Sequence, residues 1–175
     1  MIENETLKVL RERRSIRKYR REPITDAELD AILEAGTWAP TGMGKQSPVI
    51  VVVRDPETIA RLSRLNAEIM GKPDTDPFYG APTAVVVLAD GETPNWIQDG
   101  SLVMGNLMNA AASLGVGSCW INRTMETFDR PEGKNLLQKW GLPETLRGVG
   151  TCILGYADGP APDPKPRKAG YVVRV

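Results

Sequence analysis

The amino-acid sequence predicts a layered protein of helices and strands built around one buried helix. Short β-branched runs alternate with segments of helical periodicity, which is typical of helices packed on a sheet. Residues 100–122 include no charged side chain, although the chain has 22 Lys and Arg and 22 Asp and Glu residues. Its 175 residues are enough for a single domain with a proper core.

Two helices are expected in the first part of the chain. Residues 6–13 carry apolar side chains at amphipathic spacing, and the overlapping run 11–21 contains seven basic residues and one acidic residue. Thr25 followed by Glu28 has the sequence of a capping box, in which hydroxyl and carboxylate bond to the first backbone amides of a helix. This second helix should end near Gly36.

The middle of the chain predicts two strands around a further helix. Two prolines and two glycines make 37–48 a loop. The apolar run at 48–53 predicts a short buried strand. A helix is expected over 55–69, a loop over 70–82 and a second strand over 84–88.

The expected central helix begins at Thr93-Pro94, a hydroxyl cap followed by proline, and ends at Gly115. It would be ~31 Å long. Its second half is apolar or small on all sides, which is typical of a membrane span or of a helix buried all round. Polar residues such as Asn106 interrupt it, and the early glycine stop favours the buried helix over the span.

The last third of the chain predicts strands at 118–121 and 149–156, with a short helix at 132–140 between them. The proline-rich segment 159–166 predicts an extended connector. Residues 171–175 form a possible fifth strand.

Composition excludes several classes of function. The net charge is zero, so no overall field would attract nucleic acid or a membrane surface. The absence of histidine excludes Ser-His and Cys-His catalysis and histidine metal ligation, and no metal site is expected. Cys119 and Cys152 match no metal or redox spacing, so we expect buried thiols in a reducing compartment. With no apolar signal region over 1–14, a cytoplasmic protein is expected.

The basic run admits three interpretations. It could be a solvated face or a nucleic-acid patch, although the chain is neutral and only Tyr19 supplies an aromatic side chain within it. Alternatively, Arg13, Arg14, Ser15 and Arg17 lie where a helix ends and would suit a compact dianion. Guanidinium groups pair with phosphate oxygens in bidentate fashion, and a hydroxyl adds one more donor.

Several blocks of the sequence, in order and over nearly the whole chain, resemble the FMN-dependent nitroreductase family. The blocks are Arg13-Arg14-Ser15-Ile16-Arg17-Lys18-Tyr19 with Pro23-Ile24, Ala39-Pro40-Thr41 with Gln46, Gly80-Ala81-Pro82 before a valine-rich strand, the run 114–121, Leu154-Gly155-Tyr156, and Pro166-Arg167-Lys168. The sequence departs from the family pattern at Ser47-Pro48 and Gly44, which affects loop packing.

The resemblance implies an α+β fold: one nitroreductase-like domain over 1–175, an α/β/α sandwich with a central mixed sheet and a buried central helix. It also implies an intertwined homodimer with FMN at the subunit interface, and no nucleic-acid or membrane partner. The strand at 171–175 would extend the neighbour's sheet. A partner's copy could then cover the face of the central helix that its own sheet leaves open.

The resemblance also assigns residues to the cofactor. Arg13, Arg14 and Ser15 would hold the FMN phosphate, with Lys165 and Arg167 from the C-terminal arm. Arg17 would lie at the flavin N1–O2 edge and Asn66 at the pyrimidine edge. The segment that passes flavin N5 would be Trp120, Ile121, Asn122 and Arg123. The other subunit would line the isoalloxazine and ribityl chain with Pro40, Thr41, Gly42 and Gln46. Trp120 could equally be a core aromatic.

The implied activity is that of an FMN-dependent NAD(P)H oxidoreductase. It would reduce nitroaromatics, quinones or similar electron-poor acceptors by ping-pong hydride transfer through flavin N5, with NADH or NADPH as donor. No protein acid or base is evident, so the cofactor would carry the chemistry and Arg17 would tune it. The alternatives are a non-catalytic flavin binder, or flavin fragmentation, dehalogenation or azoline oxidation on the same fold.

Overall fold

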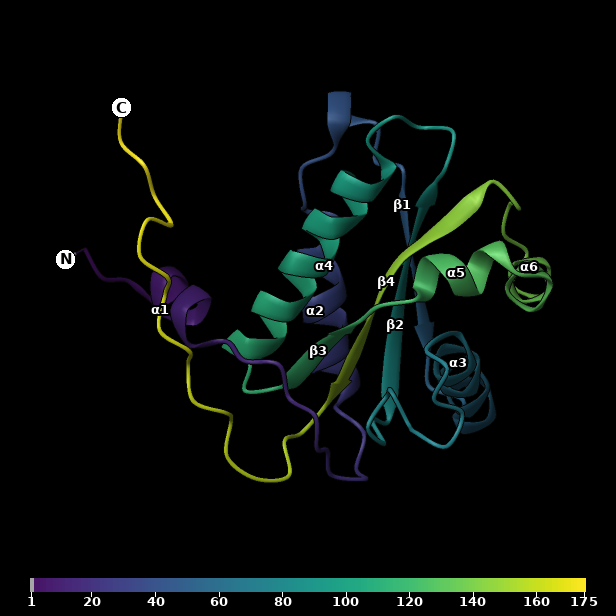
Figure 1. Cartoon of the computed structure of the whole chain (residues 1–175), viewed down its shortest axis with the longest axis horizontal. Coiled ribbons are helices and arrows are strands. Elements are labelled where there is room, and N and C mark those ends of the chain that lie inside the picture. Colours follow the sequence, from purple (N-terminus) through teal and green to yellow (C-terminus); the bar gives the residue numbers. More distant parts are fainter. Residues whose placement is uncertain (1) are drawn as a thin grey trace.

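The computed structural model describes residues 2–175 and contains a four-stranded sheet between two layers of helices (Figure 1). The strands have the order β1-β2-β4-β3. In chain order the elements are α1 (Glu5–Glu12), α2 (Asp26–Thr37), η1 (Gly42–Gly44), β1 (Pro48–Val53), α3 (Pro56–Ile69), β2 (Thr83–Asp90), α4 (Trp96–Ser113), β3 (Gly117–Ile121), α5 (Thr124–Asp129), α6 (Pro131–Lys139) and β4 (Leu146–Gly155).

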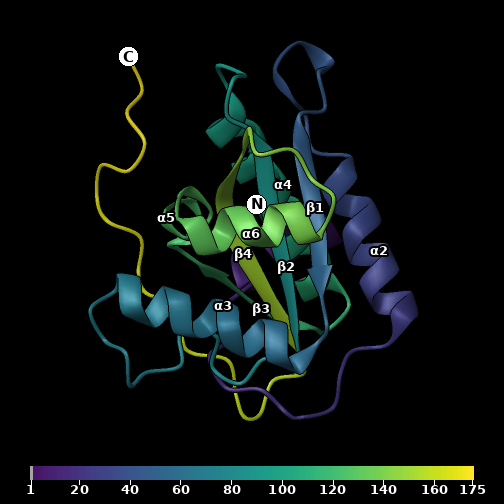
Figure 2. The ribbon, with the colours of Figure 1, turned by 90° about the vertical axis from the view of Figure 1, so that its right-hand side faces the viewer.

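Each face of the sheet has its own core. Side chains alternate across a strand, so Val85 and Val87 of β2 pack with α2 and α4, whereas Val86 and Leu88 pack with α3, α5 and α6. Figure 2 shows the layer of α3, α5 and α6 on the side that faces the viewer. The α/β/α sandwich expected from the sequence is confirmed.

Local capping explains several helix boundaries. The capping box of α2 is complete: the Thr25 hydroxyl accepts from the Glu28 amide at 3.2 Å, and Glu28 accepts from the Thr25 amide at 2.8 Å. Gly115 has φ +74°, the left-handed conformation expected where α4 stops. The expected start at Thr93-Pro94 is wrong, because Thr93 takes part in two successive turns and α4 begins at Trp96.

The sheet differs from the expected mixed sheet, since all its strand pairs are antiparallel. Parallel pairing occurs at an isolated bridge between Ser15 and Ser118, on the outer side of β3. The first strand is half-buried rather than fully buried, because β1 lies at the sheet edge. Residues 171–175 are exposed and form no strand within this chain.

The central helix α4 is covered on one side. Val103, Met104 and Leu107 are buried against the sheet and α2, whereas Ile97 and Leu102 are each 47% exposed. The polar Asn106 donates its amide to the carbonyl of Ala35 in α2, at 2.9 Å. Burial on every side is therefore not achieved within one chain. Between residues 2 and 175, no helix is both long and apolar enough to cross a membrane.

Candidate functional site

The arginine segment, residues 13–17, leaves the end of α1 and runs beside the start of β3. The amide of Ile16 donates to the carbonyl of Ser118 at 2.9 Å. This approach requires glycine at position 117, because a Cβ there would lie 2.9 Å from the Gly155 carbonyl and 3.1 Å from Ile16. The segment is thus fixed against the sheet by backbone contacts.

A cavity of about 400 Å³ opens beside this segment. Its walls come from α1, the C-terminal end of α4, the first residue of β3 and the start of the C-terminal arm, residues 157–175. Arg13 and Arg14 both line it, together with Lys8, Glu5 and Glu12. The cavity is therefore lined by charged groups on the α1 side.

Two arginine nitrogens in this segment are buried without an acceptor among the described residues: Nη1 of Arg13 and Nε of Arg14. Arg14 Nη1, in contrast, donates to the carbonyls of Arg11 and Arg13 at 2.7 and 2.8 Å. The hydroxyl of Ser118 is also buried and has no hydrogen-bond partner within residues 2–175. Leaving a buried donor unpaired costs ~1–3 kcal/mol. An anionic ligand with several oxygens, such as a phosphate, fits these unsatisfied donors.

Cys152, a buried thiol near Arg13, is not reactive. Burial, followed by the neighbouring Cys119, raises the pKa of Cys152 to about 12, although the positive charge of Arg13 opposes this rise. Both cysteines are free and buried, as expected from the sequence. Cys152 is therefore protonated at neutral pH and packs as a small apolar side chain.

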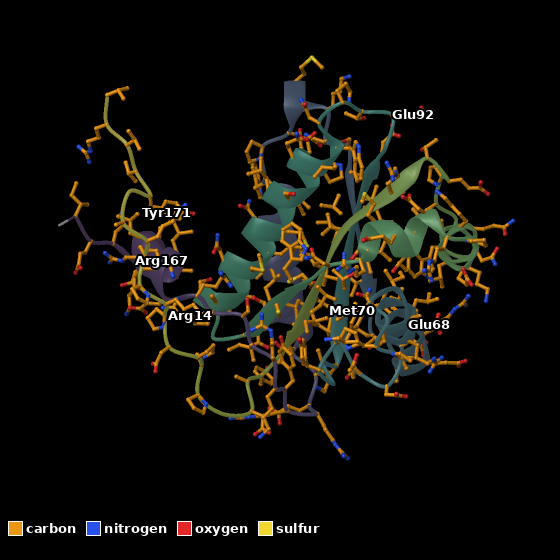
Figure 3. All side chains as sticks on the ribbon, in the orientation of Figure 1. Arg14, Glu68, Met70, Glu92, Arg167 and Tyr171 are labelled. Atoms are coloured by element: carbon orange, nitrogen blue, oxygen red, sulfur yellow. The ribbon has the colours of Figure 1, made fainter. Side chains whose placement is uncertain are left out.

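Arg17, predicted at the flavin N1–O2 edge, and the C-terminal members of the predicted phosphate group lie at the surface. Arg17 is exposed and does not line this cavity. Lys165 and Arg167 belong to the extended C-terminal arm, where Arg167 donates to the carbonyl of Lys165 at 2.6 Å. Figure 3 shows Arg167 on the same side of the molecule as Arg14.

The loop with Pro40, Thr41, Gly42 and Gln46 lies at the opposite end of α4. Its anchor is Asp99, which is 3% exposed in the first turn of that helix. The Gly42 amide donates to Asp99 Oδ1 at 2.9 Å, and the Ser47 hydroxyl lies 3.5 Å from Oδ2.

Two further contacts shape this loop. The Gln46 amide donates to the Thr41 hydroxyl at 3.0 Å. A Cβ at Gly42 would lie 2.6 Å from Nδ2 at the end of the exposed Asn95 side chain, so a larger residue there would displace that side chain. Thr41 and Gln46 line a cavity of about 310 Å³ beside Val103 of α4. Sequence reasoning missed Asp99, whose signal was its place as the last charge before the uncharged run.

These two groups of predicted residues do not meet within one chain. The loop is bonded to Asp99, whereas the cavity of the arginine segment reaches Ala112 and Ser113. The 13 helical positions from 99 to 112 correspond to ~20 Å along α4. Figure 1 shows η1 at one end of α4 and α1 beside the other.

The C-terminal end of β3 carries the predicted N5 segment. The indole of Trp120 covers Gly150, where a Cβ would come within 2.8 Å of the ring, and its Nε1 is buried without a partner among the described residues. Ile121 points into the core on the α3 side. Asn122 is exposed, and Arg123 has φ +72° and pairs with Glu126 at 3.1 Å. Trp120 is thus at least partly a packing residue.

Asn66 is buried in α3, and its Oδ1 accepts no hydrogen bond from the described residues. Asn66 thus has an unsatisfied hydrogen-bond acceptor, whereas the arginine segment has unsatisfied donors.

Comparison with known proteins gives a consistent family assignment. The model of the Nitroreductase family matches residues 10–156. A nitroreductase from Bacteroides fragilis with bound FMN is 33% identical, with a TM-score of 0.90 over 99% of this chain and 100% of that one. Another FMN-bound nitroreductase, from Desulfitobacterium hafniense, is 27% identical with a TM-score of 0.88 over 99% of this chain and 100% of that one.

Similar sequences carry related names. A protein from Archaeoglobus fulgidus, provisionally named NADH dehydrogenase/NAD(P)H nitroreductase, is 34% identical over 87% of this chain and 85% of its own length. The FMN reductase [NAD(P)H] of Bacillus subtilis is 29% identical over 93% of this chain and 70% of its own length. By its sequence and by its fold, this chain belongs to the nitroreductase family.

Proposed function

We propose that the protein is an FMN-dependent NAD(P)H oxidoreductase that reduces nitroaromatics, quinones or similar electron-poor acceptors by a ping-pong cycle. The observation that carries this proposal is the pair of buried arginine nitrogens, Arg13 Nη1 and Arg14 Nε, that have no acceptor among the described residues. Family membership and the FMN-bound relatives support it. The name of the Bacillus subtilis relative supports a nicotinamide donor.

The arginine segment would bind the FMN phosphate. Arg13 and Arg14 offer guanidinium donors to its oxygens, and the Ser15 hydroxyl adds a further donor. Because those nitrogens are shielded from water, charge pairing with them is stronger than at the open surface. Lys165 and Arg167 would add positive charge from the C-terminal arm.

The complete site would require a second copy of the chain. The loop with Pro40, Thr41, Gly42 and Gln46 lies ~20 Å along α4 from the arginine segment, so the two groups are far apart within one chain. A homodimer would bring the loop of one protomer to the arginines of its partner. It would also cover the exposed side of α4, where Ile97 and Leu102 are open to solvent. An obligate interface of this kind should bury more than ~2,000 Å².

Bound FMN would supply the redox chemistry through hydride transfer at N5. The protein's part is to position the ring and to stabilise charge. Arg17 would favour negative charge at the N1–O2 edge. Asn66 offers an unpartnered Oδ1 to the pyrimidine edge. The backbone of residues 120–122 would pass beside N5, because Ile121 directs its side chain into the core.

Flavin loading followed by rapid mixing tests this proposal. We expect equilibrium dialysis to give one FMN per chain, and we expect anaerobic NADH or NADPH to bleach the flavin in stopped flow. A nitroaromatic or quinone should then restore its absorbance. Failure to bind FMN would refute the whole proposal, whereas binding without bleaching by either nicotinamide would leave a flavin-binding protein. The double variant Arg13→Ala/Arg14→Ala should lose FMN.

A further inference from the structure

A cavity of about 590 Å³ lies outside the candidate FMN site. It opens between α3, the turn before α2 and the segment 75–82. The helix α3 packs on the opposite face of the sheet from α4. This volume falls within the ~300–1,000 Å³ typical of small-molecule sites. We call it the α3 pocket.

The α3 pocket combines basic and apolar walls. Three arginines line it: Arg21, Arg54 and Arg64. Most of the remaining wall is apolar and comes from Pro23, Pro56, Ile59, Ala60, Ala81 and Pro82.

The three arginines differ in whether they are paired with other residues. Arg54 forms an ion pair with Asp26 and donates to the Ile24 carbonyl at 3.2 Å. Within residues 2–175, Arg21 and Arg64 form no salt bridge. Two guanidinium groups at this pocket therefore remain available to an anion.

Asp76, the acidic residue of the α3 pocket, is hydrogen-bonded to groups other than the arginines. Asp76 accepts from the Ser63 hydroxyl at 2.5 Å and from the Phe78 and Gly80 amides at 2.9 and 2.6 Å. These bonds hold the 75–82 segment as a fixed wall. The Asp76 carboxylate is thus bonded within the fold, and Arg21 and Arg64 remain the charged groups of the pocket without an ion-pair partner among residues 2–175.

From this arrangement we infer that the α3 pocket binds a small organic anion, with a carboxylate or phosphate group on an apolar body. Arg21 and Arg64 would hold the anionic group in bidentate contacts. The apolar body would lie along Ile59, Ala60 and Pro82. This site does not depend on the proposed flavin chemistry and is separate from the arginine segment.

Isothermal titration of the FMN-saturated dimer with octanoate tests the inference, because FMN then already fills its own site. We expect one octanoate per chain. Arg21→Ala and Arg64→Ala should each weaken binding about three- to ten-fold, the range of charge-assisted contacts at partly exposed positions. Arg64→Lys should retain part of the affinity, because it keeps the charge but loses the fork.

Arg61→Ala provides the matched control, because Arg61 lies on the same helix but does not line the α3 pocket. This variant should bind octanoate as the parent protein does. Ala60→Phe, which places a ring in the pocket, should weaken binding without changing charge. The inference would be overturned if octan-1-ol or inorganic phosphate bound as tightly as octanoate, or if both Arg21→Ala and Arg64→Ala left the affinity unchanged.

Discussion

Replacing Asp99 tests how the loop of residues 40–47 is held. This carboxylate is buried, accepts from the Gly42 amide at 2.9 Å and lies 3.5 Å from the Ser47 hydroxyl. The first contact is well formed and involves a charged acceptor, which is worth ~1.5–3 kcal/mol. The second is at the limit of hydrogen bonding and adds little. Asp99→Ala should therefore lower the free energy of unfolding by about 2–3 kcal/mol.

For a chain of this size, that loss corresponds to a fall in Tm of about 5–10 °C. Asp99→Asn keeps an oxygen for the Gly42 amide, so it should lose about 1 kcal/mol. Thermal unfolding at fixed protein concentration measures both variants. Asp30→Ala removes an exposed carboxylate from α2 and should leave Tm within about 1–2 °C of the parent value.

The same variants should affect the cofactor if this loop faces the flavin. Asp99→Ala should weaken FMN binding, and Asp99→Asn should weaken it less. If Asp99→Ala left both Tm and FMN affinity unchanged, Asp99 would not hold the loop. A lower Tm with unaltered FMN affinity would separate the loop from the flavin site.

Three further predictions concern the flavin, the central helix and pH. Arg17→Ala should make the flavin reduction potential more negative by some tens of millivolts, since ~30 mV corresponds to ~1.4 kcal/mol. Arg13→Ala should instead weaken FMN binding with little change in the potential. If a redox titration showed no shift for Arg17→Ala, Arg17 would belong to the phosphate group. Asn106→Leu should lower the free energy of unfolding in denaturant by ~1–3 kcal/mol, because the Ala35 carbonyl of α2 then loses its hydrogen bond from Asn106. An unchanged free energy would show that water replaces that bond. The hydrogen bond from Tyr156, and to a lesser degree those from Thr25, lower the pKa of Glu28 below its usual 4.5. These bonds therefore stabilise the folded protein fully above pH 4.5, and this stabilisation is lost as the pH falls through the folded pKa. Tyr156→Phe should reduce this loss in unfolding titrations between pH 3 and 7, and an unchanged slope would contradict it.

Local signals in the sequence predicted much of the fold. Thr25 and Glu28 located the start of α2, and Gly115 located the end of α4, because capping depends on neighbouring residues. The helix α5 was missed because it has six residues and follows Arg123, which has φ +72° and makes no side-chain cap. Strand direction was also missed, since pairing depends on contacts distant in sequence.

The candidate site was only partly accessible to sequence reasoning. The arginine segment was found from its composition, and its buried unsatisfied nitrogens became visible only in three dimensions. Asp99 was missed because its partner, Gly42, is 57 positions away. The separation of the arginine segment from the loop along α4 required the structure, and it supports the assignment of the two groups to different protomers that the family resemblance implies.

The central claim is that each flavin site takes its arginine segment from one chain and its loop from the other. Complementation between two defective variants tests it directly. One variant carries Arg13→Ala and Arg14→Ala, and the other carries Gly42→Val, whose branched side chain would displace the end of the Asn95 side chain from the loop. Each variant alone should bind FMN poorly.

Heterodimers of the two variants can be isolated with two different affinity tags, and their bound FMN can be measured by dialysis and absorbance. If each site is shared between the two chains, one site of the heterodimer contains both the mutated arginine segment and the mutated loop, and the other site contains neither mutation. The account therefore predicts one tightly bound FMN per heterodimer, with bleaching by NADH or NADPH at that site. If the heterodimer bound no more FMN than the two parent variants, each site would be built within a single chain, and the shared-site account would be wrong.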